Sequence, residues 1–597
     1  MGGIFKMKFF IKIFICCLFV LSCNQVSSKY IDQINNPEIL STEISGHIKF
    51  LSADDREGRY PGTKGSQEAI DYIVDELNGS GVLPAGTDKY LQYFSFVKDI
   101  KPDGLNEIRF NNKTYNINTD FMPLEFSSNA SFSADVAFTG YGFSIKDSVE
   151  WDDYKSIDVK DRWVAILMGS PDGDHPHSKY ADHLPIRKKA MLAKDNDAKG
   201  VLFISKSDSD EFIPLRYDSN SKNMDIPIVQ ISRKFANDLL NDSLEFFQDE
   251  INSDLFPKSF LLNKNIDSKI SLKKETIQIP NIIGMIPGNH ESHKNEYIVI
   301  GAHFDHLGYG GQNSGSLAPD EQSIHNGADD NASGIAGVLE IAEKLKANQF
   351  ALNRSILFMG YNAEEQGLLG SKYYVNNPTV PLNNIVTMIN MDMIGRMSNN
   401  KITVGGTGTS SAFDSILNNV EKNHDLLITK SPEGFGPSDH SSFYINDIPV
   451  LFFFTGAHND YHKPSDDWTQ INVESEKKIL DMIYDIIIEI DQLEIKPPFT
   501  EAGPKGPSQS RTSFKVTFGI IPSYSSDAIG LEIDGARQGG PAQQAGMKKG
   551  DIIIKIGGKN ISNIYDYMYR LSELKSGESV EVTVQRGNKE LKLILNL

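Results

Sequence analysis

The sequence Glu296-Tyr-Ile-Val-Ile-Gly-Ala-His303-Phe-Asp305-His306-Leu-Gly308 joins an apolar run to three polar side chains that suit metal binding. The run 296–302 predicts a strand, and the apolar face of residues 333–346 predicts a helix. Strand and helix patterns then alternate as far as Leu493. This alternation predicts an α/β fold with a sheet covered by helices on both faces. Ligand sites in such folds form where the strands end, so the polar residues there are the candidates for chemistry.

Four more motifs follow apolar strands or precede helices in the same segment. They read GADDNASG at 327–334, NAEEQGLLGS at 362–371, NMDMIG at 390–395 and DYHKPSDD at 460–467. Each motif alone has an ordinary explanation, such as helix capping by Asp, Asn and Ser or a solvated Glu pair at a helix start. Together they supply two histidines, three carboxylates and a spare glutamate, which suits two divalent cations about 3.5–4 Å apart. Imidazole with carboxylate fits Zn²⁺, with Co²⁺ or Mn²⁺ as alternatives.

These five motifs resemble the co-catalytic di-zinc aminopeptidase family, whose relatives include bacterial leucyl aminopeptidases, glutamate carboxypeptidase II and the transferrin receptor. The upstream stretch EGRYPGTKGSQEAIDYI at 57–73 resembles the N-terminal signature of the same family. The resemblance implies a mixed sheet sandwiched by helices, as in zinc exopeptidases. It also implies two Zn²⁺ ions as cofactors and peptides as substrates.

The resemblance assigns a metal-binding role to five residues. His303 and Asp392 would hold one zinc ion, while Glu365 and His462 would hold the other. Asp330 would bridge the two ions, and the peptide bond after it would be a non-proline cis bond. All five residue types match the family pattern, which argues against a metal-free relative such as the transferrin receptor.

Two further acidic residues would complete the catalytic set. Glu364 would act as general base and acid with a metal-bridging hydroxide as nucleophile. Asp305 would pair with the second ring nitrogen of His303 and fix its tautomer. The implied activity is a metallo-exopeptidase, with an aminopeptidase that releases N-terminal residues favoured. Carboxypeptidase or glutaminyl-cyclase-like activity on the same scaffold stays open, as does a non-catalytic peptide-binding receptor or scaffold.

The segment PSDHSSF at 437–443 resembles one that lines the substrate pocket of the family. Asp439 and His440 are therefore candidate substrate-binding residues, and Tyr461 beside His462 is a third. The alternative is a loop in which Asp439 and His440 are satisfied by their neighbours.

The predicted peptidase domain is discontinuous and comprises residues 30–118 and 272–495. Residues 119–271 form a β-rich insert, which resembles a protease-associated domain through VKDRWVAILMGSP at 159–171. Such a domain would shape substrate access and carry no catalytic residue. Residues 496–511 are rich in Pro, Gly and Ser and predict a linker.

Residues 512–597 predict a separate small domain. The stretch GPAQQAGMKKGDIIIKIGG at 540–558 resembles a PDZ domain of the bacterial protease type. Phe518, Gly519 and Ile520 would form the loop that captures a peptide C-terminus, with the peptide added as a strand. A docking module that binds no peptide is the alternative.

Residues 1–22 predict a lipoprotein signal peptide. Lysines flank an apolar run at 9–21, which is too short to span a bilayer comfortably. Leu21-Ser22-Cys23 resembles a bacterial lipobox, in which Cys23 becomes the lipidated first residue. The prediction is an exported protein, periplasmic or on the cell envelope, with a lipid anchor to a membrane through Cys23. Ordinary secretory cleavage is the alternative.

Composition excludes several other classes of function. The chain has 597 residues, and 59 Lys and Arg stand against 79 Asp and Glu, for a formal net charge of −20. A nucleic-acid partner is therefore not expected, because phosphate binding needs clustered basic residues. All three cysteines lie in the first 23 residues, which excludes a disulfide framework, a thiolate metal site and a Cys nucleophile from the remainder.

Overall fold

The computed structural model describes residues 38–597, except 146–149, 174–177, 208, 218–222, 312–313, 504, 506–515, 523–527, 537–538 and 563. The predicted signal peptide and Cys23 lie outside the described residues, as do residues 504 and 506–511 of the predicted linker. Within the described part of the chain, every helix is too short or too polar to cross a bilayer. The chain divides into two compact units, Met1–Phe94 with Gln278–Pro507 and Ser95–Ile277 with Ser508–Leu597.

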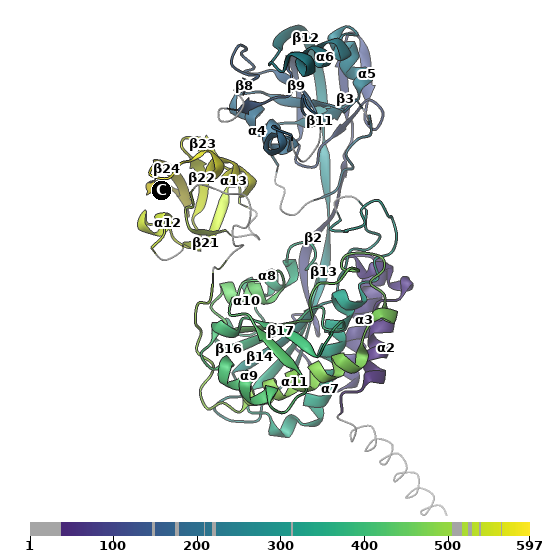
Figure 1. The fold of residues 1–597 in the computed structure, drawn as a ribbon, viewed down its shortest axis with the longest axis vertical. Helices are drawn as coiled ribbons and strands as arrows, with labels where there is room; N and C mark the ends of the chain where they lie inside the picture. Colours follow the sequence, from purple (N-terminus) through teal and green to yellow (C-terminus); the bar gives the residue numbers. More distant parts are fainter. Residues whose placement is uncertain are drawn as a thin grey trace, which may run out of the picture. The chain divides into compact units, whose positions relative to one another are not determined.

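The first unit is built on a mixed sheet, as predicted (Figure 1). Its central strands run parallel in the order β15, β14, β16 and β19, while β13 and β17 are antiparallel to their neighbours β15 and β19. The strands are β1 (Leu83–Pro84), β2 (Leu91–Pro102), which pairs with β13, β13 (Leu272–Ile286), β14 (Tyr297–His303), β15 (Ser355–Tyr361), β16 (Ile385–Met391), β17 (Lys401–Gly405), β18 (Leu427–Lys430) and β19 (Val450–Phe454).

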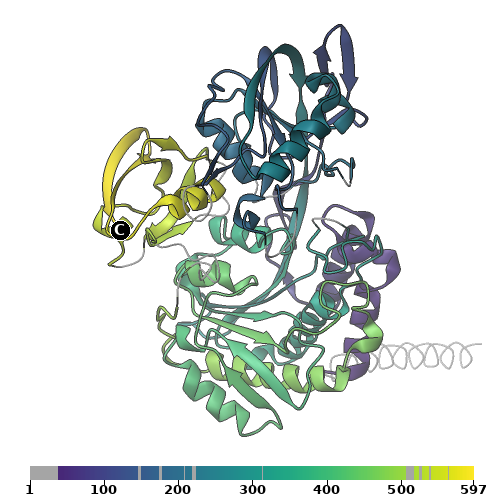
Figure 2. The ribbon, with the colours of Figure 1, turned by 45° about the horizontal axis from the view of Figure 1, so that its top comes forward.

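Helices cover both faces of this sheet (Figures 1 and 2). Successive strand residues point to opposite faces, so Ile298 and Ile300 of β14 enter one core and Val299 enters the other. The first core is closed by α2 (Ser41–Leu51), α3 (Lys64–Gly79), α7 (Gly334–Ala347), α9 (Phe413–Glu421) and α11 (Val473–Asp491). The second is closed by α8 (Leu369–Asn376) and α10 (His440–Ile445).

The second unit contains the predicted β-rich insert. Its sheet has the order β4-β3-β12-β6-β9-β10-β11-β5, and two apolar clusters lie on its faces. The elements are β3 (Glu107–Phe110), β4 (Lys113–Asn116), β5 (Phe121–Pro123), β6 (Ala130–Thr139), β7 (Ser144–Ile145), β8 (Trp151–Asp152), β9 (Trp163–Leu167), α4 (Ile186–Asp195), β10 (Gly200–Ile204), β11 (Ile228–Ile231), α5 (Arg233–Leu240), α6 (Leu244–Asp254) and β12 (Ser259–Ile270).

The C-terminal part of the second unit has an apolar cluster of its own, which includes Phe518, Ile533 and Val582. This agrees with the sequence pattern of short strands around a small core. The elements are β20 (Ile520–Pro522), β21 (Leu531–Ala536), α12 (Pro541–Gln544), β22 (Ile552–Ile556), β23 (Lys559–Asn560), α13 (Ile564–Glu573), β24 (Ser579–Arg586) and β25 (Lys589–Asn596).

The boundaries of the units differ from the predicted domain boundaries. They fall after Phe94 and after Ile277, inside β2 (Leu91–Pro102) and β13, whereas the sequence suggested 118 and 271. The reason is strand pairing: β3 and β4 join the sheet of the insert, since Ile108 of β3 pairs with Ser268 of β12. The chain passes between the units along the long strands β2 and β13, without a linker rich in Pro, Gly and Ser. The sequence therefore gives no sign of these boundaries.

A test of this packing uses two helical glycines of the first unit. A Cβ atom at Gly65, in the first turn of α3, would lie 1.9 Å from the carbonyl oxygen of Arg56, while a Cβ at Gly46 in α2 would meet nothing within 4 Å. We expect Gly65→Ala to destabilise the unit by about 1–3 kcal/mol, because backbone must move. We expect Gly46→Ala to stabilise it by about 0.5–1 kcal/mol. Calorimetric melting of both variants measures the two shifts, and equal shifts would contradict this packing.

Candidate metal centre and active site

The predicted ligands gather at the carboxyl edge of the parallel strands. His303 is the last residue of β14, and Asp392 follows β16 directly. Glu365 lies in the loop after β15, and His462 lies in the loop after β19. Asp330 precedes α7 and completes the set. Because β15, β14, β16 and β19 are parallel neighbours, residues far apart in sequence meet at one edge.

The five residues form two groups that share Asp330. Nε2 of His303 lies 3.3 Å from Oδ1 of Asp330 and 3.5 Å from Oδ1 of Asp392. Nε2 of His462 lies 3.2 Å from Oδ2 of Asp330 and 3.2 Å from Oε2 of Glu365. Ligand atoms around one tetrahedral Zn²⁺ are separated by about 3.4 Å, as follows from bonds of about 2.1 Å. The spacing therefore suits one cation in each group, with Asp330 offering one oxygen to each.

The burial of the groups also suits cations. His303 is 1% exposed, Asp330 4% and Asp392 9%, so these charges have little contact with water. Several buried carboxylates this close together repel one another strongly unless positive charge compensates them. The nitrogen and oxygen donor set, with sulfur absent from it, matches the ligands that Zn²⁺ prefers.

Glu364 lies beside the first group and outside its ligand set. Its Oε2 is 3.9 Å from Nε2 of His303, and its side chain is only 10% exposed. Burial, reinforced by the nearby charges of Asp439, Glu365 and Asp392, raises the pKa of Glu364 well above its usual range. A buried carboxyl that readily holds a proton is suited to general acid and base chemistry.

The role of Asp305 differs from the predicted pairing with His303. Its carboxylate lies 3.9 Å from Nδ1 of His303, beyond hydrogen-bonding distance, while its own main-chain oxygen lies 3.2 Å from that nitrogen. The carboxylate instead accepts the backbone N–H groups of Glu364 at 2.9 Å and Glu365 at 3.3 Å. Burial raises the pKa of Asp305 to about 6. Asp305 thus orients the imidazole through its carbonyl and the two glutamates through its side chain.

The loop that carries Asp330 is held from both sides. The peptide bond Asp330–Asn331 is cis, which confirms the prediction. Oδ1 of Asn331 accepts the N–H of Gly334, and its Nδ2 donates to the carbonyl of Met391 at the end of β16. The carboxylate of Asp466 accepts the backbone N–H groups of Asp329 and Asp330, at 3.0 and 3.1 Å from its Oδ2. These bonds set the position from which Asp330 faces both groups.

Three residues that the sequence argument left without a role lie against these ligands. Nδ1 of His306 is 2.6 Å from Oε1 of Glu365, and Asp466 supports the Asp330 loop as described above. Arg59 is buried and donates four hydrogen bonds to main-chain carbonyls, those of Leu51, Phe304, Asn326 and Gly327. All three residues lie inside motifs that resemble the family. Their place in those motifs is the one feature of the sequence that could have indicated a functional role.

The candidate substrate-binding residues lie at different depths. Asp439 is 0% exposed and His440 1%, at the start of α10. Burial raises the pKa of Asp439 to about 7 and lowers that of His440 to about 3, and the His440 ring stacks on Phe452 at 4.3 Å. Tyr461 is half-buried and stacks on His462 at 3.9 Å. Contact of these three residues with a substrate stays a prediction. Tyr461 is the most accessible of them, because Asp439 and His440 are buried.

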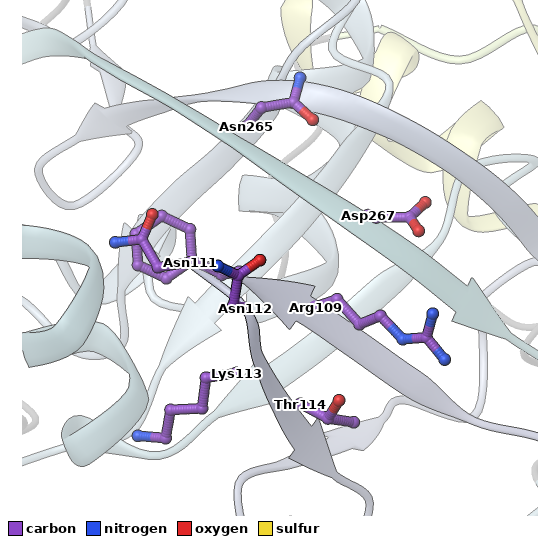
Figure 3. Close-up of a pocket in the computed structure, with 8 residues that line it drawn as sticks. Arg109, Asn111, Asn112, Lys113, Thr114, Asn265 and Asp267 are labelled. Carbon is purple, nitrogen blue, oxygen red and sulfur yellow. The ribbon is translucent and has the colours of Figure 1, made fainter.

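Other candidates lie outside this centre. Phe518 is buried and its carbonyl accepts the N–H of Ala542, while Gly519 has a φ of 68°. Peptide capture by residues 518–520 stays a prediction. Figure 3 shows a surface pocket of the insert, lined by the β3–β4 hairpin with Asn265 and Asp267 of β12. None of the predicted site residues lines it.

Residues 281–487 match the family model of peptidase family M28, and residues 521–597 match that of the PDZ domain. The chain carries a domain of peptidase family M28. The M28 match runs from β13 to α11 and includes all five predicted ligands and Glu364. The PDZ match confirms the prediction for the C-terminal domain.

The M28 domain is similar to several named aminopeptidases. Leucine aminopeptidase 2 of Trichophyton rubrum is 31% identical over 172 residues, which are 27% of this chain and 31% of that protein. Leupeptin-inactivating enzyme 1 of Streptomyces exfoliatus is 32% identical over 184 residues, which are 31% of this chain and 37% of that protein. The chain thus spans about a third of the length of these curated relatives.

Two solved structures are also similar. A zinc aminopeptidase from Bacillus subtilis is 20% identical, with a TM-score of 0.46 over 79% of this chain and 100% of that chain. An aminopeptidase from Aneurinibacillus sp. strain AM-1 is 18% identical, with a TM-score of 0.46 over 79% of this chain and 97% of that chain.

The shared carboxylate gives a direct test of the paired groups. We expect the purified chain to retain about two Zn²⁺ ions after dialysis, as a co-catalytic pair requires. Asp330→Ala should lower the affinity for both ions at once, while His303→Ala should lower it mainly for one. Metal analysis of dialysed protein measures the stoichiometry. Asp467→Asn is the control, because among the described residues that side chain bonds only Thr469, in the short 3-10 helix that it caps. Equal retention by all variants would contradict the shared site.

Proposed function

We propose that this protein is a di-zinc metallo-exopeptidase, and that it acts as an aminopeptidase. The observation that carries the proposal is the position of Asp330, whose two oxygens face two separate histidine–carboxylate groups, with Glu364 buried beside them. Membership of the M28 family and the names of the curated relatives, leucine aminopeptidases among them, support a peptide substrate. The enzyme class rests on this geometry together with those similarities.

The residues of this chain divide the work of hydrolysis. Two zinc ions held by His303, Asp392, Asp330, Glu365 and His462 would supply Lewis-acid polarisation of the carbonyl and acidify water. Glu364 accepts a proton from the attacking water and delivers it to the leaving amine, so its buried carboxyl changes protonation state twice in each cycle.

Asp305 keeps that proton carrier in place. Its carboxylate fixes the backbone N–H groups of Glu364 and Glu365. The proton carrier and the adjacent metal ligand therefore keep a constant spacing, and catalysis depends steeply on such spacing.

The proposal is tested with one peptide that carries either a free or an acetylated N-terminus. We expect cleavage of the free-amine peptide only, lost with a chelator and restored by Zn²⁺. Glu364→Gln should retain zinc yet lower kcat by about 10²–10⁴-fold, because the proton carrier is removed. Full activity of that variant would contradict the role of Glu364. Cleavage of the acetylated peptide from its C-terminal end would favour a carboxypeptidase, and turnover of neither peptide despite bound zinc would favour a cyclase or a scaffold.

We also propose that the protein is exported and carries a lipid on Cys23. The support is the signal-like sequence before Leu21-Ser22-Cys23. In a bacterial host, the full chain should incorporate labelled palmitate and enter the membrane fraction. Cys23→Ala should abolish both, while Cys17→Ala, inside the predicted signal, should change neither. Palmitate incorporation by Cys23→Ala would contradict the proposal.

A further inference from the structure

A third buried histidine contacts the carboxylates of the second metal group. His306 lies three residues after His303, and its ring is 0% exposed. Its Nδ1 lies 2.6 Å from Oε1 of Glu365, while Oε2 of the same carboxylate lies 3.2 Å from Nε2 of His462. The two oxygens of Glu365 therefore have different partners, one imidazole on each.

The distances indicate that His306 is a hydrogen-bond donor to Glu365 and not a metal ligand. Within the two groups, neighbouring ligand atoms lie 3.2–3.5 Å apart, as expected around a tetrahedral ion. The 2.6 Å between His306 and Glu365 is shorter and matches a charge-assisted hydrogen bond. Nδ1 of His306 lies 4.0 Å from Oδ2 of Asp330, farther than the four histidine–carboxylate distances within the two groups.

We propose that His306 is a positioning residue for the second metal ion. Its Nδ1–H donates to Oε1 of Glu365, so that Glu365 presents Oε2 to the ion it shares with His462 and Asp330. The inference rests on the proposed metallopeptidase function and adds a positioning residue to the five predicted ligands. His306 acts on the ion through Glu365 and does not bind it.

The surroundings of the ring hold it in this orientation. Gly327 adopts a φ of 55°, and a Cβ there would lie 2.6 Å from Cγ and Cδ2 of His306. The imidazole therefore packs directly against bare backbone. The carbonyl of Gly327 accepts a hydrogen bond from Arg59 at 2.8 Å, which fixes that backbone in turn.

Among the described residues, the hydrogen bonding of the His306 ring runs through Nδ1 alone. Nε2 of His306 is buried and has no hydrogen-bond partner among the described residues. A donor at Nδ1 aimed at a ligand oxygen is the arrangement by which neighbouring hydrogen bonds orient metal ligands.

The test measures zinc affinity by competition with a chromophoric chelator and uses His306→Ala and His306→Asn in the full chain. We expect His306→Ala to weaken one of the two zinc ions about 10–100-fold and leave the other within about twofold. His306→Asn places an amide N–H near the position of Nδ1 and should restore most of the affinity. His325→Asn is the matched control, because among the described residues this neighbouring buried histidine bonds Ser316 and Ser323 and none of the predicted ligands.

Each outcome decides the inference without reference to peptide cleavage. Unchanged affinity in His306→Ala would overturn it. Complete loss of one ion in both His306 variants, with an altered visible spectrum of the Co²⁺-loaded protein, would make His306 a ligand and overturn the positioning role. If the alanine variant misfolds, the asparagine variant alone decides, because a ligand role predicts a lost ion and a positioning role predicts near-native affinity. Two ions bound normally by a chain that cleaves no peptide would reject the proposed function and leave this inference intact.

Discussion

The centre depends on one constraint, which is that a cluster of carboxylates must stay together in the interior without water to separate their charges. Asp330 is the carboxylate that both groups share, because one of its oxygens faces His303 and the other faces His462. Like charges at this separation force one another to take up protons unless cations compensate them. The neighbouring protein groups therefore either donate to the carboxylates or fix the loops that carry them.

Arg59 helps to meet this constraint through the loops that carry the predicted ligands. Its guanidinium is buried, and burial lowers its pKa to about 10 while the Asp330 and Asp305 charges oppose that change, so it stays charged near neutral pH. It donates to the carbonyl of Phe304 in one ligand loop and to those of Asn326 and Gly327 in the next. A single positive charge thus neutralises part of the cluster and ties two loops together. A planar guanidinium with five donors can do this, whereas a lysine cannot.

Local patterns predicted much of the fold and the polar residue types at the strand ends. Apolar runs of strand length, each followed by Asp, Glu or His, placed the strand ends, and the family resemblance implied that His303, Asp330 and Asp392 are neighbours. The boundaries between the units were not predictable, because residues 107–116 join a distant strand through backbone hydrogen bonds that leave no compositional trace. The bond of Asp305 was also missed, since its carbonyl and carboxylate compete for the same imidazole and only distances decide between them.

By itself the sequence determined which residue types could bind a metal and in which order strands would deliver them, because strand periodicity and side-chain chemistry are local properties. The tertiary structure decided which oxygen of each carboxylate faces which imidazole. It separated His306, at 2.6 Å from an oxygen of Glu365, from His325, which bonds Ser316 although both histidines lie in the same segment. Such choices depend on the packing of several loops at once. Hydrogen-bond direction and distance are set by that packing, and no spacing along the chain encodes them.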